Sequence, residues 1–313
     1  MLFLDQAAVA NALPYPALMD ALASGLQQPI QSPLHSHFEP NNDASSVLIM
    51  PAWRPQVRMG VKLVSIWPGN GAVGKPAVSG VYVLLSCTDG QAIAVMDGTE
   101  LTARRTAATA ALGARLLARP NSRTLAVLGT GSLCVPLVQA HCSAQPFQRV
   151  LVWGRRLEQA ERVVAELSQL GIAAEAQADL QTVLANADVA AAASTATTPF
   201  IRRDWVQPGT HLGLIGAFTP AMAEAEPGLM ARCQLFADNR EAVLQKGGEV
   251  LQAIQQGLIQ ASAIEAELVE LVAAPEHAWR LANAAITVFK SVGFAALDLI
   301  AAEQVMAQQA CGK

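Results

Sequence analysis

Short apolar runs alternate with helical stretches along the second part of the chain. The runs are TLAVLGTG (124–131), RVLVWGRR (149–156), DVAAAAS (188–194), THLGLIGA (210–217) and QLFAD (234–238). Helical stretches such as SLCVPLVQAHCSA (132–144) lie between them. Continuous apolar strands that alternate with helices are typical of a parallel sheet covered on both faces. The pattern therefore predicts an α/β fold with a doubly wound Rossmann domain.

The first part of the chain has a different pattern. Two helical stretches flank four strand-like runs, which are SSVLIMPAW (45–53), VRMGVKLVSIWP (57–68), VSGVYVLLSC (78–87) and AIAVMDG (92–98). The turn sequence CTDGQ (87–91), between the last two runs, predicts a hairpin. These features predict an α+β domain with a mixed or antiparallel sheet.

The stretch TVFKSVGFAALDLIAAEQVMAQQ (287–309) is interpreted as one helical segment, and no strand-like run follows it. We therefore expect it to return to the first domain, which makes that domain discontinuous. The predicted domains are residues 1–118 together with 287–313, and residues 119–286. A chain of 313 residues is long enough for two domains of ordinary size.

Composition narrows the class of protein. Hydrophobic residues make up 52% of the chain and the formal net charge is −4. Without an excess of basic groups to neutralise phosphates, nucleic acid is not an expected partner. The N-terminal stretch lacks the charged and long apolar regions of a secretory signal, and no later run is long enough to cross a bilayer. We expect a cytoplasmic protein that binds small molecules.

The cysteines and histidines give no sign of a metal site. Five scattered cysteines (Cys87, Cys134, Cys142, Cys233 and Cys311) form no CxxC pair, which argues against a disulfide framework and against zinc. His35 and His37 lie close in sequence, but no acid or thiol stands beside them at ligand spacing. No metal is therefore expected.

A glycine-containing turn follows the first strand of the predicted Rossmann domain. Its residues are Gly129, Thr130, Gly131, Ser132 and Leu133. Gly129 permits a tight turn, and Gly131 leaves room for a pyrophosphate to approach backbone N–H groups at the start of the next helix. Cys134 occupies the third position of the motif, where Gly or Ala is usual. The turn predicts dinucleotide binding, and the simpler interpretation is an ordinary strand-to-helix turn.

The end of the second strand bears on which dinucleotide is bound. An NAD-selective domain usually has an acidic residue there for the ribose 2′-hydroxyl, whereas this chain has Arg155 and Arg156. Two guanidinium groups can pair with a 2′-phosphate. The pattern therefore favours NADP(H), with NAD(H) possible. The alternative is a pair of solvated arginines at a helix start.

Two basic positions in the first domain are candidates for chemistry. Lys62 lies inside an apolar strand-like run, where an isolated ammonium would be costly unless an anion met it. Arg105 lies in LTARRTAA (101–108), near the start of an alanine-rich helix, where a guanidinium and free N–H groups can face one anion. The alternatives are a strand-edge lysine that reaches solvent and an arginine that ties the helix to a neighbouring carboxylate.

Several blocks together resemble one known family. MGVKLVSIWPGN, AVMDGTELTARRTAATAA, AVLGTGSL, VLVWGRR, PGTHLGLIGAF and TVFKSVGFAALDLIAA are similar, in order and spacing, to blocks of the ornithine cyclodeaminase/mu-crystallin family. The resemblance implies a homodimer built through the discontinuous domain, NAD(H) or NADP(H) on the Rossmann domain, and an amino or imino acid in the cleft between domains. It also implies that Lys62 is catalytic and binds the substrate carboxylate, which Arg105 binds as well.

Two departures from the family pattern refine this expectation. Ornithine cyclodeaminases have a catalytic aspartate in a Gly-Gly-Asp segment, and here Ala217 stands at that position. The segment GAFTPAMAE (216–224) resembles the branch that reduces cyclic imino acids, the Δ1-pyrroline-2-carboxylate and Δ1-piperideine-2-carboxylate reductases. Gln31 stands where many members have an arginine that helps to hold the substrate, and His35 or His37 is a candidate replacement.

Reduction of such an imino acid to L-proline or L-pipecolate is the leading hypothesis. The alternatives are ornithine cyclodeamination, an amino-acid dehydrogenase, and a mu-crystallin-like NADPH-dependent binder. The family-matched segments add further candidates, namely Ser79 for the substrate, and Thr195 and Lys290 for the cofactor. Each of these also has an ordinary interpretation as a turn or capping residue.

Overall fold

The computed structural model describes residues 1–41, 43 and 45–311. Contacts between Cα atoms divide the chain into two compact units. Unit 1 consists of Met1–Thr106 and Phe294–Lys313, and unit 2 of Ala107–Gly293. Each unit has its own sheet, so the two are described separately.

Unit 1 is built on a sheet that has, among the described residues, six strands in the order β1-β6-β5-β4-β3-β2. They are β1 (Leu2–Leu4), β2 (Ser36–Phe38), β3 (Ser46–Arg54), β4 (Arg58–Ile66), β5 (Val78–Ser86) and β6 (Ala92–Asp97). All pairs are antiparallel except β1 with β6. The hairpin predicted at 87–91 is confirmed, since Gly90 has φ +72° and its N–H donates to Ser86 O at 3.0 Å. The sheet is thus mixed, as the sequence predicts.

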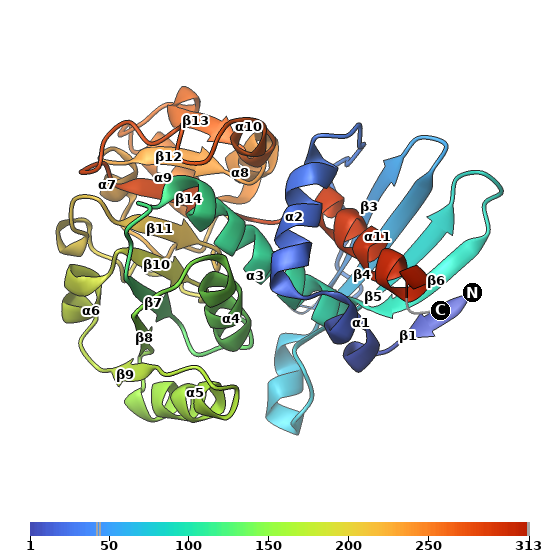
Figure 1. Ribbon diagram of the computed structural model, residues 1–313, viewed down its shortest axis with the longest axis horizontal. Helices are drawn as coiled ribbons and strands as arrows, with labels where there is room; N and C mark the ends of the chain where they lie inside the picture. The colour runs from blue at the N-terminus through green and yellow to red at the C-terminus, as the bar shows by residue number, and fades with distance from the viewer. Residues whose placement is uncertain (42, 44, 312–313) are drawn as a thin grey trace. The chain divides into compact units, whose positions relative to one another are not determined.

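Helices cover one face of this sheet. Unit 1 contains α1 (Gln6–Ala12), α2 (Tyr15–Leu26) and α11 (Ala295–Cys311), together with a short 3₁₀ turn, η1 (Pro68–Val73). α11 packs against α2 and against β3 and β4 (Figure 1). Alternate residues of the long strands, such as Ala52, Leu84 and Met96, are buried beneath these helices. The period of two in each strand therefore decides which side chains meet α11.

Unit 2 contains a parallel sheet with the order β13-β12-β14-β11-β10-β7-β8-β9 within the described residues (Figure 1). The strands are β7 (Thr124–Leu128), β8 (Arg149–Trp153), β9 (Glu175–Gln177), β10 (Val189–Ala192), β11 (His211–Leu214), β12 (Gln234–Ala237), β13 (Ile264–Glu267) and β14 (Thr287–Lys290). From β7 the chain proceeds outward in both directions, to β8 and β9 and then to β10 and β11. This reversal of strand order is the mark of the doubly wound fold and confirms the predicted class.

Helices and short turns connect these strands. They are α4 (Cys134–Ala144), α5 (Leu157–Gln169), α6 (Leu180–Asn186), α7 (Pro227–Met230), α8 (Arg240–Lys246), α9 (Gly248–Gln255), α10 (Leu268–Ala273), η2 (Arg203–Trp205) and η3 (Ala261–Ala263). All residues of β10, β11, β12 and β14 are buried. Central strands of a covered sheet are expected to be mainly apolar, and the polar residues of these strands, such as Thr287 and Lys290, lie at their ends.

The expected helix from residue 287 differs from the structure. Thr287–Lys290 is strand β14, which lies between β11 and β12, and the helix begins only at Ala295. Gly293, with φ +76°, separates the two elements. The helix α3 (Gly98–Leu117) crosses from unit 1 into unit 2, and Gly113 on it lies against the Phe289 ring of β14. Both boundaries of unit 2 therefore lie outside the expected 119–286.

In the described part of the chain, no helix is long and apolar enough to cross a membrane. Cys87, Cys134, Cys142 and Cys233 are free thiols, and the side chain of Cys311 lies outside the described residues. Burial raises the pKa of the Cys134 thiol to about 12, so this thiol is a packing group. Among the residues described, no three His, Cys, Asp or Glu side chains are grouped as metal ligands.

Candidate active site

Two cations and one carboxylate form a buried cluster in unit 1. Lys62 Nζ lies 2.8 Å from Asp298 Oδ2, and Arg105 Nε donates to Asp298 Oδ1, also at 2.8 Å. The side chains of Lys62 and Arg105 are 2% and 7% exposed, and that of Asp298 is fully buried. Each carboxylate oxygen thus accepts from one cation. With all three groups ionised, the cluster carries a net charge of +1.

Local structure explains how three distant segments meet here. Lys62 lies on β4 between residues that point to the opposite face, so the pleat turns its side chain toward α11. Asp298 is in the first turn of α11, where a negative charge is favoured by the helix dipole. Arg105 is in the helix α3 that follows β6. The polar cluster is therefore fixed by elements that are otherwise apolar.

Burial and mutual charge set the protonation of the cluster. Burial lowers the pKa of Lys62 to about 8, against the opposing effect of Asp298 and with a further lowering by Arg105. Burial acts to raise the pKa of Asp298, but Arg105 and Lys62 outweigh it, so the pKa of Asp298 lies below its ordinary value. At neutral pH the cluster therefore holds a carboxylate, a guanidinium and an ammonium that can release its proton in a mildly basic range.

In unit 2, the glycine turn after β7 has the conformation that a dinucleotide requires. Gly129 has φ +122°, and a Cβ there would lie 2.7 Å from Ala193 O, in the segment after β10. A Cβ on Gly131 would meet nothing within 4 Å. The turn is therefore tight at its first glycine and open at its second, as the approach of a phosphate demands.

The tip of β8 is close to this turn. A Cβ on Gly154 would lie 2.6 Å from Thr130 Cγ2, and Thr130 Oγ1 donates to Gln159 Oε1 at 3.2 Å. Arg155 and Arg156 follow Gly154 and are both exposed. The two guanidinium groups are therefore at the surface beside the glycine turn, where they can pair with an anionic group of a ligand.

A second buried charged group lies at the carboxyl ends of the strands. Glu224 Oε1 accepts from Ser194 N at 2.6 Å, and its Oε2 accepts from Gly216 N at 2.7 Å. Glu249 Oε1 accepts from Glu224 N at 2.9 Å. Lys290 Nζ lies 2.9 Å from Glu249 Oε2 as an ion pair, although the directions of the two groups do not meet hydrogen-bond geometry. Lys290 and Glu249 are fully buried.

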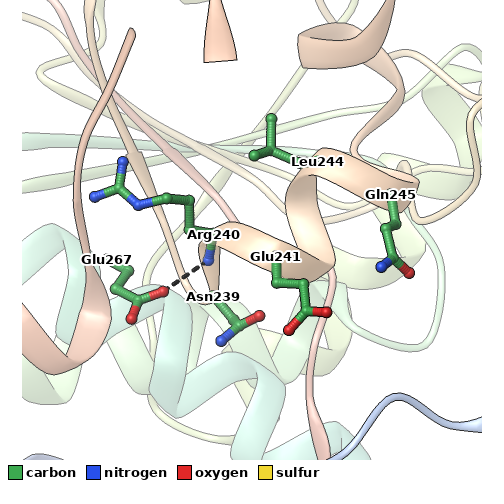
Figure 2. A pocket seen from close by; sticks show the side chains of 6 residues that line it. All are labelled: Asn239, Arg240, Glu241, Leu244, Gln245 and Glu267. Atoms are coloured by element: carbon green, nitrogen blue, oxygen red, sulfur yellow. Dashed lines mark hydrogen bonds between the residues drawn. The ribbon is translucent and has the colours of Figure 1, made fainter. Parts of the chain in front are cut away.

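An open depression of about 500 Å³ lies beside the carboxyl ends of β12 and β13 (Figure 2). It is lined by Asn239, Arg240, Glu241, Leu244, Gln245 and Glu267. The backbone N–H of Arg240 donates to Glu267 Oε2 at 2.8 Å, and the Arg240 guanidinium contacts Ile264 O and Glu270. The arginine is thus committed to its own neighbours, and the depression contains no residue of the two clusters above.

Comparison with known proteins gives this arrangement a family. Residues 4–312 match the model of the ornithine cyclodeaminase/mu-crystallin family. The chain belongs to this family. It is 39% identical over 255 residues to a Delta(1)-pyrroline-2-carboxylate reductase of Paracoccus denitrificans. The matched region covers 81% of this chain and 80% of that protein.

Solved structures of similar proteins agree in fold over the whole chain. The Delta(1)-pyrroline-2-carboxylate reductase of Thermococcus litoralis, in complex with NADH and L-proline, has a TM-score of 0.94 at 26% identity. That match covers 100% of this chain and 98% of the other. An archaeal alanine dehydrogenase dimer with bound NAD has a TM-score of 0.91 at 26% identity, with 100% and 97% covered.

The family-matched candidates of unit 1 occupy different places. Lys62 and Arg105 are brought together, whereas Ser79 lies on the other face of the sheet, where its hydroxyl is 2.9 Å from that of Ser65. Gln31 pairs through its backbone with Trp53, and its side chain is exposed. The structure thus joins neither Ser79 nor Gln31 to the cationic cluster.

In unit 2, Thr195 is exposed beside Ser194, at the carboxyl end of β10. Ala217, at the position of the cyclodeaminase aspartate, is fully buried. Lys290 is buried against Glu249, which leaves its ammonium no exposed side for a ligand.

Three acidic residues of these clusters were not among the sequence candidates. Asp298 is the one acid in the apolar stretch AALDLIAA, which is a signal comparable to that of Lys62. Glu224 and Glu249 lie in segments with other polar residues, and no pattern marks them as buried. A lone charge in an apolar run can be recognised from sequence, but a buried carboxylate in a polar loop cannot.

Proposed function

We propose that this chain reduces a cyclic imino acid, Δ1-pyrroline-2-carboxylate or Δ1-piperideine-2-carboxylate, with a nicotinamide dinucleotide, to give L-proline or L-pipecolate. The observation that carries the proposal is the buried pair of cations, Lys62 and Arg105, which lie side by side on the two oxygens of Asp298. The Delta(1)-pyrroline-2-carboxylate reductases to which the chain is similar support the same reaction.

In this proposal the cationic cluster binds the carboxylate of the substrate. Asp298 orients Lys62 and Arg105 by accepting one hydrogen bond from each. Two cations side by side attract an anion, and burial strengthens that attraction relative to water. A small acid with a single carboxylate matches this charge, which is why an imino acid fits better than a neutral substrate.

Lys62 is also suited to proton transfer to the substrate. A protonated imine is a better hydride acceptor than a neutral one. With a pKa of about 8, Lys62 is charged at neutral pH yet close enough to neutrality to give or keep a proton at a neighbouring nitrogen. The lysine therefore holds the carboxylate and keeps the imine protonated.

The residues that fit the dinucleotide are those of the glycine turn for the pyrophosphate, namely Gly129, Thr130, Gly131, Ser132 and Leu133, and Thr195 in the segment after β10 is a further candidate. When bound, the reduced nicotinamide supplies the hydride. Arg155 and Arg156 are exposed beside the glycine turn and can pair with a 2′-phosphate, which supports a preference for NADP(H) over NAD(H). The open space at Gly131 supports the fit.

We also propose that the chain forms a homodimer through the uncovered face of the unit 1 sheet. Phe3, Leu63 and Val81 are 74%, 37% and 43% exposed there. Leu63 lies between Ile49 and Val81 in the cross-strand register, so the apolar side chains form a continuous row. A sheet with one face under helices and an apolar opposite face is suited to burial against a second copy.

The proposed reaction is tested by the absorbance of the reduced nicotinamide. Each of the two imino acids is offered with NADPH and with NADH, and ornithine is offered with NAD in parallel. Consumption with an imino acid supports the reductase, and faster consumption with NADPH supports the role of Arg155 and Arg156. Ammonia from ornithine without consumption of an imino acid would show a cyclodeaminase instead, and tight NADPH binding without turnover would show a binder.

A further inference from the structure

The buried carboxylate of Glu224 joins two loops that leave the sheet at neighbouring strands. Ser194 is in the segment after β10 and Gly216 in the segment after β11. Each offers a backbone N–H to a different oxygen of Glu224, at 2.6 and 2.7 Å. Such short bonds are typical of an ionised acceptor. The side chain thus acts as a clamp between the two loops.

The clamped loops are in close contact with the glycine turn. A Cβ on Gly216 would lie 2.0 Å from Ser194 O and 2.2 Å from Ser194 N, so the two backbones touch. Ala193, the residue before Ser194, is the one whose carbonyl faces Gly129. A continuous series of contacts therefore runs from the loop after β7, through the loop after β10, to the loop after β11.

The clamp is itself anchored from the other side. Glu249, near the start of α9, accepts from the backbone N–H of Glu224, and Lys290 on β14 neutralises Glu249. α9 also lies close to the loop before Glu224, since a Cβ on Gly248 would lie 1.7 Å from Met222 O. Two fully buried carboxylates and one ammonium are costly to bury, and an apolar core would avoid that cost. Burial of these three charged groups is explained if the N–H groups of Ser194 and Gly216 require one rigidly held carboxylate that accepts from both.

We propose that Glu224 is a positioning residue of the dinucleotide site: its carboxylate fixes the loops after β10 and β11 against the glycine turn, and Glu249 and Lys290 hold it in place. The inference rests on the proposed function, in that these loops bind the dinucleotide. It gives Lys290 a part in the site without direct contact with the cofactor.

Among side chains of this size, only a carboxylate offers an acceptor oxygen to both loop N–H groups. Both loop N–H groups need an oxygen, and a glutamine amide supplies only one, so its NH₂ group must face a backbone N–H. The variant Glu224→Gln has the same size and removes a buried charge, which leaves overall packing intact. It should therefore disturb the two loops while the fold is kept.

The matched control is Glu226→Gln, two residues along the chain. Glu226 Oε2 also accepts from a backbone N–H, that of Arg203, at 2.9 Å, but it is partly exposed and outside the clamp. Both changes replace a carboxylate that accepts from a backbone amide. Only Glu224→Gln breaks the link between the loops after β10 and β11.

The first readout is direct binding of NADH and NADPH to the purified chain, followed by nicotinamide fluorescence. Glu224→Gln is expected to weaken binding of the better cofactor about tenfold or more, since a buried N–H loses its acceptor. The KM for the cofactor should rise accordingly, and the KM for the imino acid should change much less. Glu226→Gln should resemble the parent chain, and urea unfolding should show both variants folded.

The pH profile of the parent chain and of both variants gives a second readout. Burial and the nearby Glu249 raise the pKa of Glu224 to about 7, against the lowering effects of Lys290 and of the two loop N–H groups. Protonation below pH 7 turns one acceptor oxygen into a hydroxyl. The KM for the cofactor should therefore rise as the pH falls through 7 in the parent chain and in Glu226→Gln, but not in Glu224→Gln.

Cofactor binding and a pH profile that are the same in Glu224→Gln and Glu226→Gln would overturn this inference while leaving the proposed reaction standing. A parent chain that binds neither dinucleotide would overturn both.

Discussion

At the scale of single residues, Asp298 decides what Lys62 and Arg105 can do. A buried ammonium and guanidinium side by side would repel each other, and the carboxylate that they share offsets this repulsion. With this carboxylate, the three groups together still carry one excess positive charge. The chemistry proposed for the pair therefore depends on a third residue that never needs to touch the substrate.

Replacing Arg105 by alanine should reduce use of the imino acid and spare the cofactor. A hydrogen bond to a charged group contributes about 1.5–3 kcal/mol, so kcat/KM for the imino acid should fall roughly 10- to 150-fold. The neighbouring Arg104→Ala is the control, since Arg104 pairs with Glu100 and is partly exposed. Steady-state kinetics and NADH titration distinguish the two. Equal losses for substrate and cofactor in Arg105→Ala would indicate a folding role instead.

Replacing Asp298 by asparagine should move the pH profile. The carboxylate raises the pKa of Lys62 against burial, so its loss lowers that pKa further below about 8. An opposite charge at this range shifts a pKa by about 1–3 units. The alkaline limb of kcat/KM should therefore appear at least about one pH unit lower in Asp298→Asn. A limb that stays in place would contradict the protonated role of Lys62.

The control for this change lies on the same helix. Glu303 pairs with Arg54 at 3.0 Å, and the pair is also largely buried. Glu303→Gln removes a carboxylate from α11 at another site, so it should lower the free energy of unfolding without moving the pH limb. Parallel urea titrations separate loss of stability from change of protonation.

At the scale of elements, the carboxyl ends of β10 and β11 leave no room for a side chain between their loops. Gly216→Ala introduces a Cβ 2.0 Å from Ser194 O, a backbone atom that cannot rotate away. Overpacking of this kind costs about 1–3 kcal/mol. We expect a lower melting temperature and weaker NADH binding.

Gly228→Ala provides the comparison for this change. A Cβ on Gly228, in α7, would have only the Arg203 side chain nearby, at 3.7 Å. Because alanine favours a helix over glycine by about 1 kcal/mol, its melting temperature should stay the same or rise. A Gly216→Ala variant as stable as Gly228→Ala would show that the two loops can separate freely.

The sequence predicted elements better where the pattern was long than where it was short. The four strand-like runs predicted for the first domain, now β3 to β6, and the strand–turn–helix at Gly129 were confirmed, because each has a clear period and clear turn residues. The four-residue strand β14 was taken for the start of α11, since TVFK is short and only Lys290 and Ser291 separate its apolar residues from the next apolar run. Only the sheet itself, which places these residues between β11 and β12, decides their conformation.

At the scale of the whole molecule, the proposed dimer is open to a direct test. Val81→Glu places a charge at one end of the apolar row formed with Ile49 and Leu63. Burying that charge against a second copy is costly, so the variant should sediment as a monomer where the parent sediments as a dimer. Leu281→Glu, at a site in unit 2 that is 80% exposed, should leave the dimer unchanged. A monomeric parent chain would contradict the proposal.

Long-range partners limited what could be predicted of the site. Lys62 and Arg105 were recognised as cations that need an anion, but Asp298 lies 236 and 193 residues away from them. Sequence separation of this size carries no periodic signal. The clamp at Glu224 was missed because no periodic pattern links its carboxylate to Ser194, 30 residues away, or to Gly216, eight residues away in the same loop.

The discontinuity of unit 1 has a consequence for the order in which the protein is made. The strands of its sheet are synthesised first, but α11, which covers them, leaves the ribosome only after all of unit 2. Unit 2 can fold as it emerges, while Lys62 waits through some two hundred residues of synthesis without its counter-ion. During that interval the face that α11 covers is incomplete, so apolar strand residues such as Ala52 and Leu84 are exposed at the stage when a nascent chain is most prone to aggregate.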